Sequence, residues 1–190
     1  MIYTRKTDVF LELWERADIA NEAKADLFIS VHCNSHSSQA HGTETFVLGI
    51  DCNKKNMAIA QKENSVIFLE DNYEKRYEGF DPSKPESTIG LELMQEEFLD
   101  QSISLAAFVE EEFKSGVKRS SRGVKQNIFW VLHRSVMPSV LIETGFLTNT
   151  KEGKFLNSNA GQLKMAKAIG SAVTKYKETI FANRAEEAVL

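Results

Sequence analysis

The chain has 190 residues, of which 42% are hydrophobic and 26% are charged, and its formal net charge at pH 7 is −4. This length is enough for one domain with a substantial core and short for two. The weak charge, with acidic and basic residues interspersed, gives no electrostatic footprint for nucleic acid or for an anionic membrane. We find neither a bilayer-spanning apolar run nor an apolar signal core at the N-terminus, so we expect no transmembrane segment.

The first predicted element is an amphipathic helix close to the N-terminus. Residues 1–4 resemble the end of a strand, and Asp8 is the predicted N-cap of the helix that follows. The helix ends between Asn21 and Ala25. Apolar residues recur at steps of three and four along it, as a helix with one buried face requires. They are Phe10, Leu13, Trp14, Ala17 and Ala20.

Two strands are predicted next. The run from Leu27 to Val31 is apolar except for Ser30, which is typical of a strand covered by helices on both faces, and it continues into His32-Cys33-Asn34. After a polar loop, residues 43–48 alternate and are rich in β-formers, so they predict a second strand. Cys33 and Cys52 form neither a disulfide framework nor a zinc knuckle, and we expect free thiols.

The middle of the chain is less regular. A helical run from Met57 to about Asp71 precedes a loop over 77–87 that contains two prolines and a glycine. Beyond Ser87 the apolar spacing predicts two helices broken near Ser102. We interpret residues 73–101 as a helical insertion, although apolar residues at helical spacing usually indicate core packing alone.

The last predicted elements are strands over 123–132 and 139–142 and a helix over 162–180. Residues 1–180 are therefore interpreted as one domain, followed by a frayed tail over 181–190. Strands that alternate with helices predict an α/β fold. We expect a mostly parallel or mixed sheet with helices on both faces, a three-layer sandwich like that of phosphorylases and hydrolases.

Two reactive side chains lie at the far ends of strand-like runs, His32 after Leu27–Val31 and Glu143 after Pro138–Ile142. Ligand crevices form beyond the carboxyl ends of parallel strands, so this placement indicates a metal ligand and a general base. A catalytic zinc ion normally takes three protein ligands and a water, and no other segment obviously supplies the missing ones. An isolated strand-end histidine is more often a hydrogen-bonded core residue, and such a glutamate is usually solvated or salt-bridged.

The three other histidines offer weaker candidates for metal binding. His36 follows His32 by four residues, but in a Ser/Asn loop that spacing fixes no common face. We interpret His36 as a surface residue and expect His41 and His133 to be solvated loop residues.

Several stretches of the chain resemble the zinc-dependent N-acetylmuramoyl-L-alanine amidases of bacteria, the amidase type 3 family. The resemblance extends from Tyr3 to Ile180. It is carried by Arg16 to Asn34, Gly42-Thr43-Glu44-Thr45, Pro138 to Phe146, and Asn149. Further motifs resemble the branch common in Bacteroidetes-like bacteria, namely Glu63-Asn64-Ser65-Val66-Ile67, Asp81-Pro82 and Pro85-Glu86-Ser87.

The resemblance implies hydrolysis of the amide between N-acetylmuramic acid and the L-alanine of the peptidoglycan stem. It implies His32 as a zinc ligand, Glu143 as the base, and Asn34 and Asn149 at the rim of the substrate site. In the family a His in a Gly-rich loop and a Glu near the first helix complete the zinc site. By this resemblance we expect an N-terminally truncated family fold, without the family's first strand, Gly-His loop and first helix, and therefore with an incomplete zinc site.

The predicted insertion suggests regulation by the same resemblance. In related amidases a helix at this place covers the active site, and its Glu occupies the metal until an activator protein withdraws it. Glu86 and Glu92 are the candidates here. The implied substrate, peptidoglycan, indicates the periplasm or cell envelope. A metal-free, inactive relative that binds peptidoglycan or a partner protein is the alternative, and a carboxypeptidase-like zinc hydrolase ranks lower.

Overall fold

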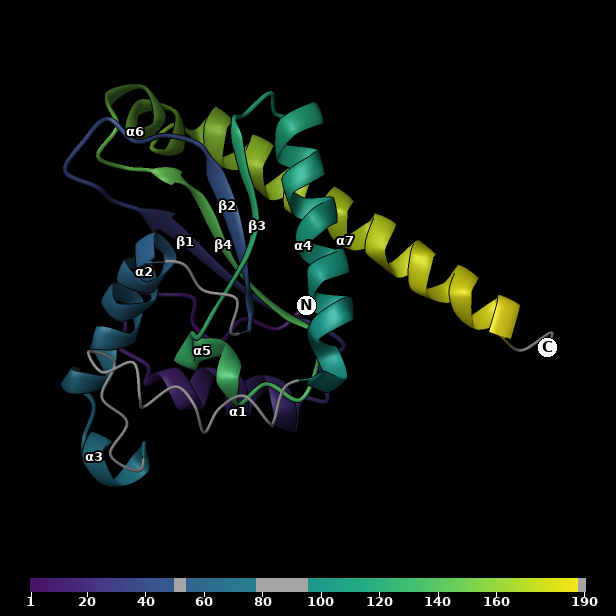
Figure 1. The fold of residues 1–190 in the computed structure, drawn as a ribbon, viewed down its shortest axis with the longest axis horizontal. Coiled ribbons are helices and arrows are strands. Elements are labelled where there is room, and N and C mark those ends of the chain that lie inside the picture. Colours follow the sequence, from purple (N-terminus) through teal and green to yellow (C-terminus); the bar gives the residue numbers. More distant parts are fainter. Residues whose placement is uncertain (50–53, 78–95, 188–190) are drawn as a thin grey trace. The chain divides into compact units, whose positions relative to one another are not determined.

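The structure is a computed structural model that describes residues 1–49, 54–77 and 96–187. Its strands form a four-stranded sheet in the order β1-β4-β2-β3 (Figure 1). The strand bounds are β1 Phe28–Asn34, β2 Thr43–Leu48, β3 Ser121–Asn127 and β4 Ser139–Phe146. The second predicted strand has the predicted bounds, and the last one extends four residues beyond the prediction.

The sheet is mixed in direction. β2 and β4 pair antiparallel, with Glu44 opposite Glu143. Backbone bonds from Phe28 N to Pro138 O (3.0 Å) and from Leu147 N to Asn34 O (2.9 Å) show that β1 and β4 run in the same direction. The predicted α/β fold with a mixed sheet is confirmed.

Helices account for most of the remaining described chain. Their bounds are α1 Leu13–Glu22, α2 Lys54–Asn64, a 3₁₀ helix η1 Ser65–Leu69, α3 Tyr73–Arg76, α4 Glu96–Ser115, α5 Trp130–His133, α6 Thr150–Leu156 and α7 Asn159–Glu187. In the described part of the chain, none of these helices combines the length and the apolar character that crossing a membrane requires.

The chain divides into two compact units that each consist of three segments. Unit 1 comprises Met1–Ser30, Val47–Asp100 and Lys125–Val140, and unit 2 comprises Val31–Phe46, Gln101–Val124 and Leu141–Leu190. Each strand contributes residues to both units. The single domain over 1–180 stays a prediction.

In unit 1, helix α1 begins at Leu13 because three glutamates satisfy backbone N–H groups at its start. The Leu13 N–H donates to Glu70 Oε1 at 2.8 Å, and Glu12 and Glu15 form a capping box. The predicted start at Asp8 is therefore wrong. Residues 1–4 form no strand, so that expectation is wrong as well.

The segment after β3 also differs from the prediction of a strand over 123–132. Asn64, at the end of α2, donates from Nδ2 to Ile128 O (2.8 Å) and accepts from Trp130 N (3.0 Å) through Oδ1. The backbone at these positions thus bonds to a side chain instead of a neighbouring strand. β3 ends at Asn127, and the short helix α5 begins at Trp130.

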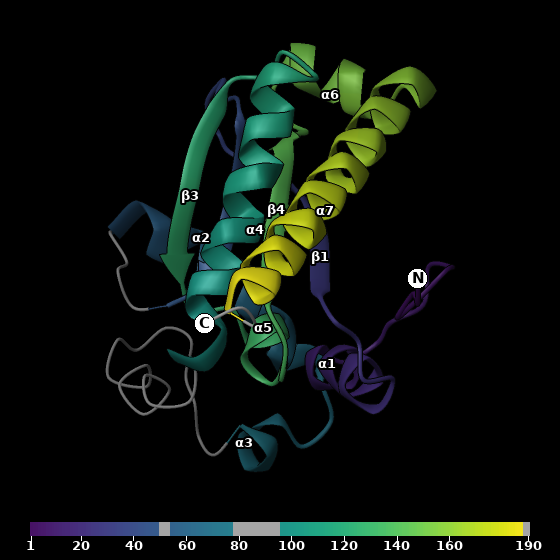
Figure 2. The same cartoon turned by 90° about the vertical axis from the view of Figure 1, so that its right-hand side faces the viewer.

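In unit 2, two long helices carry buried stripes at helical spacing. Leu105, Val109 and Phe113 are buried on α4, and Met165, Ala168, Ala172 and Tyr176 are buried on α7. The helices lie side by side in Figure 2, and Lys175 of α7 contacts Glu112 of α4 at 2.5 Å. α4 passes through the buried Ser102 without the predicted break, and α7 continues past residue 180 to Glu187.

β1 lies at one end of the strand order, and its outward side chains are more exposed than the sequence predicts. Val31 is 57% exposed, so the expectation of a strand covered on both faces is wrong at this position. Cys33 is a free, exposed thiol, as predicted. Cys52, Glu86 and Glu92 lie outside the described residues.

Candidate active site

The structure brings His32 and Glu143 together. A ring nitrogen of His32 and a carboxylate oxygen of Glu143 lie within 4.8 Å of each other. The two residues come from β1 and β4, neighbouring strands that run in the same direction, and both lie in the second half of their strand. Glu143 is fully buried and His32 is partly exposed, so the imidazole is the more accessible of the two groups.

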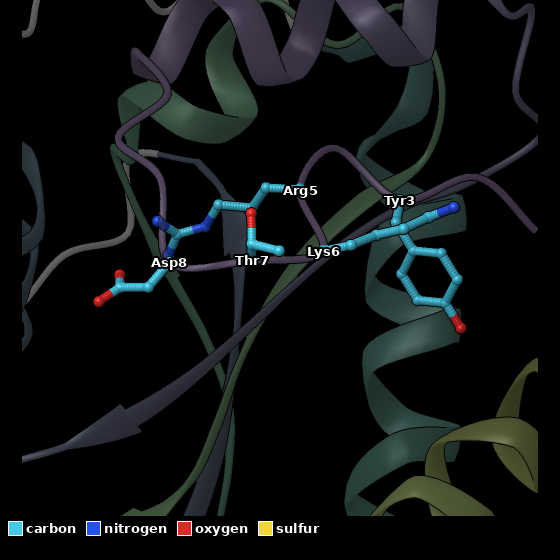
Figure 3. A pocket seen from close by; sticks show the side chains of 5 residues that line it. All are labelled: Tyr3, Arg5, Lys6, Thr7 and Asp8. Carbon is cyan, nitrogen blue, oxygen red and sulfur yellow. The ribbon is translucent and has the colours of Figure 1, made fainter.

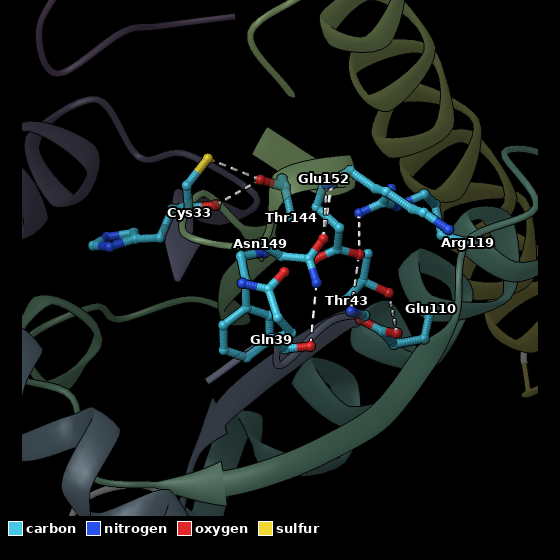
Figure 4. A network of polar contacts seen from close by, with 12 residues as sticks. Cys33, Gln39, Thr43, Glu110, Arg119, Thr144, Asn149 and Glu152 are labelled. Carbon is cyan, nitrogen blue, oxygen red and sulfur yellow. Dashed lines mark hydrogen bonds and ion pairs between the residues drawn. The ribbon is translucent and has the colours of Figure 1, made fainter. Parts of the chain in front are cut away.

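Thr144 fixes the His32 backbone against β4. Its hydroxyl donates to the His32 carbonyl oxygen at 2.8 Å and lies 3.2 Å from Cys33 Sγ (Figure 4). The side chain of Thr144 therefore adds a bond between strands right beside the catalytic candidates, which limits how far His32 and Glu143 can separate.

A second buried glutamate, Glu44, lies next to Glu143. The two residues are opposite each other in the antiparallel pair β2–β4, so their side chains project from the same face of the sheet. Glu44 Oε1 accepts from Asn34 Nδ2 at 3.0 Å, and Oε2 accepts from Arg122 Nε at 3.0 Å. Opposed carboxylates repel, and the Arg122 cation compensates the charge of Glu44.

The neighbours of Glu44 on β2 project from the opposite face, because strand side chains alternate. Thr43 and Thr45 donate their hydroxyls to the buried carboxyl of Glu110 on α4, at 2.9 and 2.7 Å, and Ser121 donates to it at 2.5 Å. Burial raises the pKa of Glu110 above its ordinary 4.5, and the charge of Glu44 adds to this, whereas the hydroxyl bonds oppose it. β2 thus separates two buried carboxyl sites.

The structure gives both predicted rim residues a bonding role. Asn149 is the N-cap of α6, where its Oδ1 accepts from Lys151 N (3.0 Å) and Glu152 N (3.1 Å), while its Nδ2 donates to Gln39 O (3.1 Å). Asn34 donates to Glu44. Asn34 is 3% exposed and Asn149 is 8% exposed. Their place on a substrate rim stays a prediction.

Sequence reasoning did not identify Glu152, which joins three segments behind the site. Its carboxylate accepts from Gly42 N at 2.9 Å and from Phe146 N at 2.8 Å, and it pairs with Arg119 (Figure 4). Gly145 lies inside β4 with a φ of +139°, and a Cβ there would come within 2.7 Å of Arg119 Nη2. Only glycine fits this position without strain.

The other histidines lie apart from a metal-type cluster among the described residues. His36 and His41 are exposed, as predicted. His133 is half-buried on α5 and its ring lies 4.6 Å from the Trp130 ring, so the prediction of a solvated loop residue is wrong. Burial lowers the pKa of His133 below its ordinary 6.5, and the Arg134 charge adds to this effect.

A hollow of about 590 Å³ occurs in unit 1, at the N-terminal segment (Figure 3). All the residues that line it belong to one short stretch, and they are Tyr3, Arg5, Lys6, Thr7 and Asp8. No histidine or pair of carboxylates lines this hollow, in contrast to the site formed by His32 and Glu143. We therefore assign the candidate active site to His32 and Glu143.

An imidazole beside a buried carboxylate on neighbouring strands of an α/β sheet is typical of metal-dependent hydrolases. The family model of N-acetylmuramoyl-L-alanine amidase matches residues 1–175. The chain therefore belongs to this amidase family. It is 31% identical over 176 residues to the N-acetylmuramoyl-L-alanine amidase AmiA of Escherichia coli K12, covering 91% of this chain and 59% of that relative.

Solved structures agree with this family assignment. An N-acetylmuramoyl-L-alanine amidase from Clostridium difficile 630 matches with a TM-score of 0.63 and 26% identity, over 92% of this chain and 69% of that one. The CwlD amidase of Clostridioides difficile, solved with the GerS lipoprotein, matches with a TM-score of 0.64 and 25% identity. This match covers 94% of this chain and 75% of that one. The chain thus spans about three fifths of the length of AmiA and more of these solved chains.

Proposed function

We propose that the protein hydrolyses the amide between N-acetylmuramic acid and the L-alanine of the peptidoglycan stem. The observation that carries this proposal is the approach of His32 and Glu143 to within 4.8 Å, in a chain of this family. This pair offers a metal ligand and a proton acceptor at one place, which are two of the requirements for metal-assisted amide hydrolysis.

The donor atoms of the site fit a zinc ion. Imidazole nitrogen and carboxylate oxygen are both ligands that zinc accepts. The His32 carbonyl is held by Thr144, so the backbone that carries the imidazole is fixed. His32 is the residue that would hold the metal, together with further ligands. A bound zinc ion lowers the pKa of its water and polarises the scissile carbonyl.

Glu143 is the proton carrier in this proposal. Its carboxylate accepts the proton of the attacking water and returns it to the leaving nitrogen of L-alanine. The side chain comes from the middle of a strand that is buried throughout its length, so its backbone cannot shift easily. The neighbouring Glu44 pairs with Arg122 and accepts a hydrogen bond from Asn34, so its carboxylate is engaged in linking the strands.

The test is cleavage of N-acetylmuramoyl peptides by the purified chain supplied with zinc. New alanine amino groups are quantified for the wild type and for Glu143→Gln. We expect the variant to lose at least about 100-fold in kcat, because it removes the proton acceptor and keeps the side-chain shape. Glu111→Gln, a change at an exposed position of α4, is the matched control and should retain full activity.

Two results would contradict the proposal. Equal rates for the wild type and Glu143→Gln would show that Glu143 is no base. Binding of muramoyl peptides without any release of alanine amine would favour the alternative of a non-catalytic relative that binds peptidoglycan.

The proposal places the protein in the periplasm or cell envelope, because its substrate is found there. This expectation is supported by the family itself, which includes a relative described as a cell wall amidase. Fractionation of cells that produce the tagged full-length protein tests this expectation, and recovery only with cytoplasmic markers would contradict it.

Control by an activator protein is part of the proposal and rests on sequence position alone. Glu86 and Glu92 are its candidates for metal occupation. If they inhibit, replacing both by glutamine raises the rate of the zinc-loaded protein on cell-wall sacculi. An unchanged rate would contradict the hypothesis that Glu86 and Glu92 inhibit the protein.

A further inference from the structure

A row of polar side chains extends across all four strands on one face of unit 2. It begins with His32 and Asn34 on β1, continues through Glu143 on β4 and Glu44 on β2, and ends with Arg122 on β3. The register between β2 and β4 and the bonds of Glu44 to Asn34 and Arg122 define this order. Arg122 is therefore the cation at the far end of the row that contains the catalytic pair.

The Arg122 guanidinium is held in place from two sides. Its Nε donates to the fully buried Glu44, and its central carbon lies 5.4 Å from the Phe146 ring centroid. Within the described residues, these are the polar and ring contacts of its guanidinium. A guanidinium carries five N–H donors, one on Nε and four on the two Nη groups. The bond to Glu44 uses the Nε donor, so the Nη donors can bind a ligand.

Arg122 is also open to solvent. Its side chain is 39% exposed, whereas the Glu44 side chain is fully buried. For comparison, the Arg119–Glu152 pair behind the site has side chains that are 13% and 8% exposed. Arg119 is thus enclosed by its contacts, and Arg122 presents part of a fixed guanidinium to the solvent.

We propose that Arg122 binds a carboxylate of the stem peptide and so helps to select the substrate of the proposed hydrolysis. Arginine suits this role because its planar fork matches a carboxylate with two parallel hydrogen bonds. The inference rests on the proposed function, since the muramoyl peptide supplies the ligand.

The spacing of the strands restricts which carboxylate is bound. β3 and β4 are separated by β2, which places Arg122 roughly 10 Å from the strand that carries Glu143. An extended peptide covers about 3.3–3.6 Å per residue. With the scissile amide at Glu143, the carboxylate belongs to about the first three residues of the stem.

The experiment measures binding by the chelator-treated, metal-free protein, so that no turnover occurs. The probes are an N-acetylmuramoyl tripeptide with free carboxylates and the same compound with every carboxylate converted to carboxamide. Calorimetry should show that the wild type binds the free acid about tenfold more tightly than the amide. Arg122→Gln should reduce this preference to less than about twofold.

Because Arg122→Gln leaves Glu44 without its cation, this variant risks a folding defect. The double variant Glu44→Gln/Arg122→Gln removes both charges and keeps an acceptor for Asn34. It should fold and still lack the carboxylate preference. Arg134→Gln, at a 47% exposed arginine that pairs with Asp18, is the matched control and should bind both probes like the wild type.

The outcomes separate this inference from the proposed function. A double variant that prefers the free acid as the wild type does would show that Arg122 only balances the charge of Glu44, and the inference would be overturned. A wild type that binds both probes equally would also overturn it while leaving the proposed function intact. A wild type that binds neither probe overturns the inference as well, and the cleavage assay of the zinc-loaded protein decides the proposed function separately.

Discussion

Glu110 is a carboxyl group inside unit 2 whose protonation depends on its surroundings. Burial raises its pKa above 4.5, Glu44 adds to the rise, and hydroxyl bonds from Ser121, Thr45 and Thr43 oppose it. The folded state therefore binds the Glu110 proton more tightly than the unfolded state does. By linkage, this contribution to stability is present at low pH and is lost as the pH rises from 4.5 through the folded pKa.

Replacing Glu110 by glutamine should remove that pH dependence, because an amide does not titrate. We expect the melting temperature of Glu110→Gln, relative to that of the wild type, to increase as the pH rises above 4.5. Thermal unfolding monitored by circular dichroism at several pH values measures the difference. A constant difference between the two proteins across this range would show that the folded pKa of Glu110 is not raised.

Single residues also show how far sequence reasoning reaches. His32 and Glu143 are visible as candidates because each ends an apolar run. Glu44 is visible as part of a family motif and of an alternating strand. Its partnership with Arg122 links residues 78 positions apart in the chain. No local pattern predicts which arginine meets a buried glutamate, since that depends on the strand order.

Among the elements, α6 gives a direct test of a capping residue. Asn149 accepts two backbone N–H groups at its N-terminus, from Lys151 and Glu152. Asn149→Ala should lower the free energy of unfolding by about 1 kcal/mol, whereas Asn149→Asp keeps the acceptor and should cost less. Urea denaturation measures both. Equal losses would mean that the Nδ2 bond to Gln39, and not the cap, dominates.

Element boundaries were predicted less well than element types. The helix near the N-terminus exists, but its first turn is capped by Glu70, which follows Leu13 by 57 positions. β3 exists, but Asn64 bonds to the backbone that follows it and stops the strand early. In both cases a side chain distant in the sequence sets the boundary, so the propensities of the residues near the boundary do not predict it.

Helix α4 shows that a boundary predicted from the sequence can also be absent from the structure. The polar Ser102 indicates a break in the apolar pattern, yet α4 continues through it with the side chain buried. Packing of Leu105 and Val109 in unit 2 stabilises this helix over a position that has low helix propensity. Whether the helix continues through such a position therefore depends on tertiary packing and not on local propensity.

For the whole molecule, zinc should stabilise the folded state, because a ligand that binds only the native protein shifts the unfolding equilibrium. At a free zinc concentration about a hundred times Kd the gain is about 2.7 kcal/mol. This corresponds to a rise in melting temperature of roughly 5–10 °C for a chain of this size. Differential scanning fluorimetry against a zinc series measures it.

The variants identify the site responsible for that shift. His32→Ala should abolish most of the zinc-dependent rise, while His36→Ala, at an exposed histidine four positions on, should leave it unchanged. A full rise in His32→Ala would place the zinc elsewhere in the protein. No rise in the wild type would favour the metal-free alternative.

The alternation of Thr43, Glu44 and Thr45 also bears on how the chain finds its strand pairing. If β2 slipped by one residue, Glu44 would turn toward Glu110 and the two threonines would turn toward Glu143. Carboxylates buried without their partners cost several kcal/mol, so the slipped sheet is rejected. Apolar residues would pack on either face and give no such discrimination. These polar contacts therefore contribute to the candidate site and also favour the native register of β2 over a register shifted by one residue.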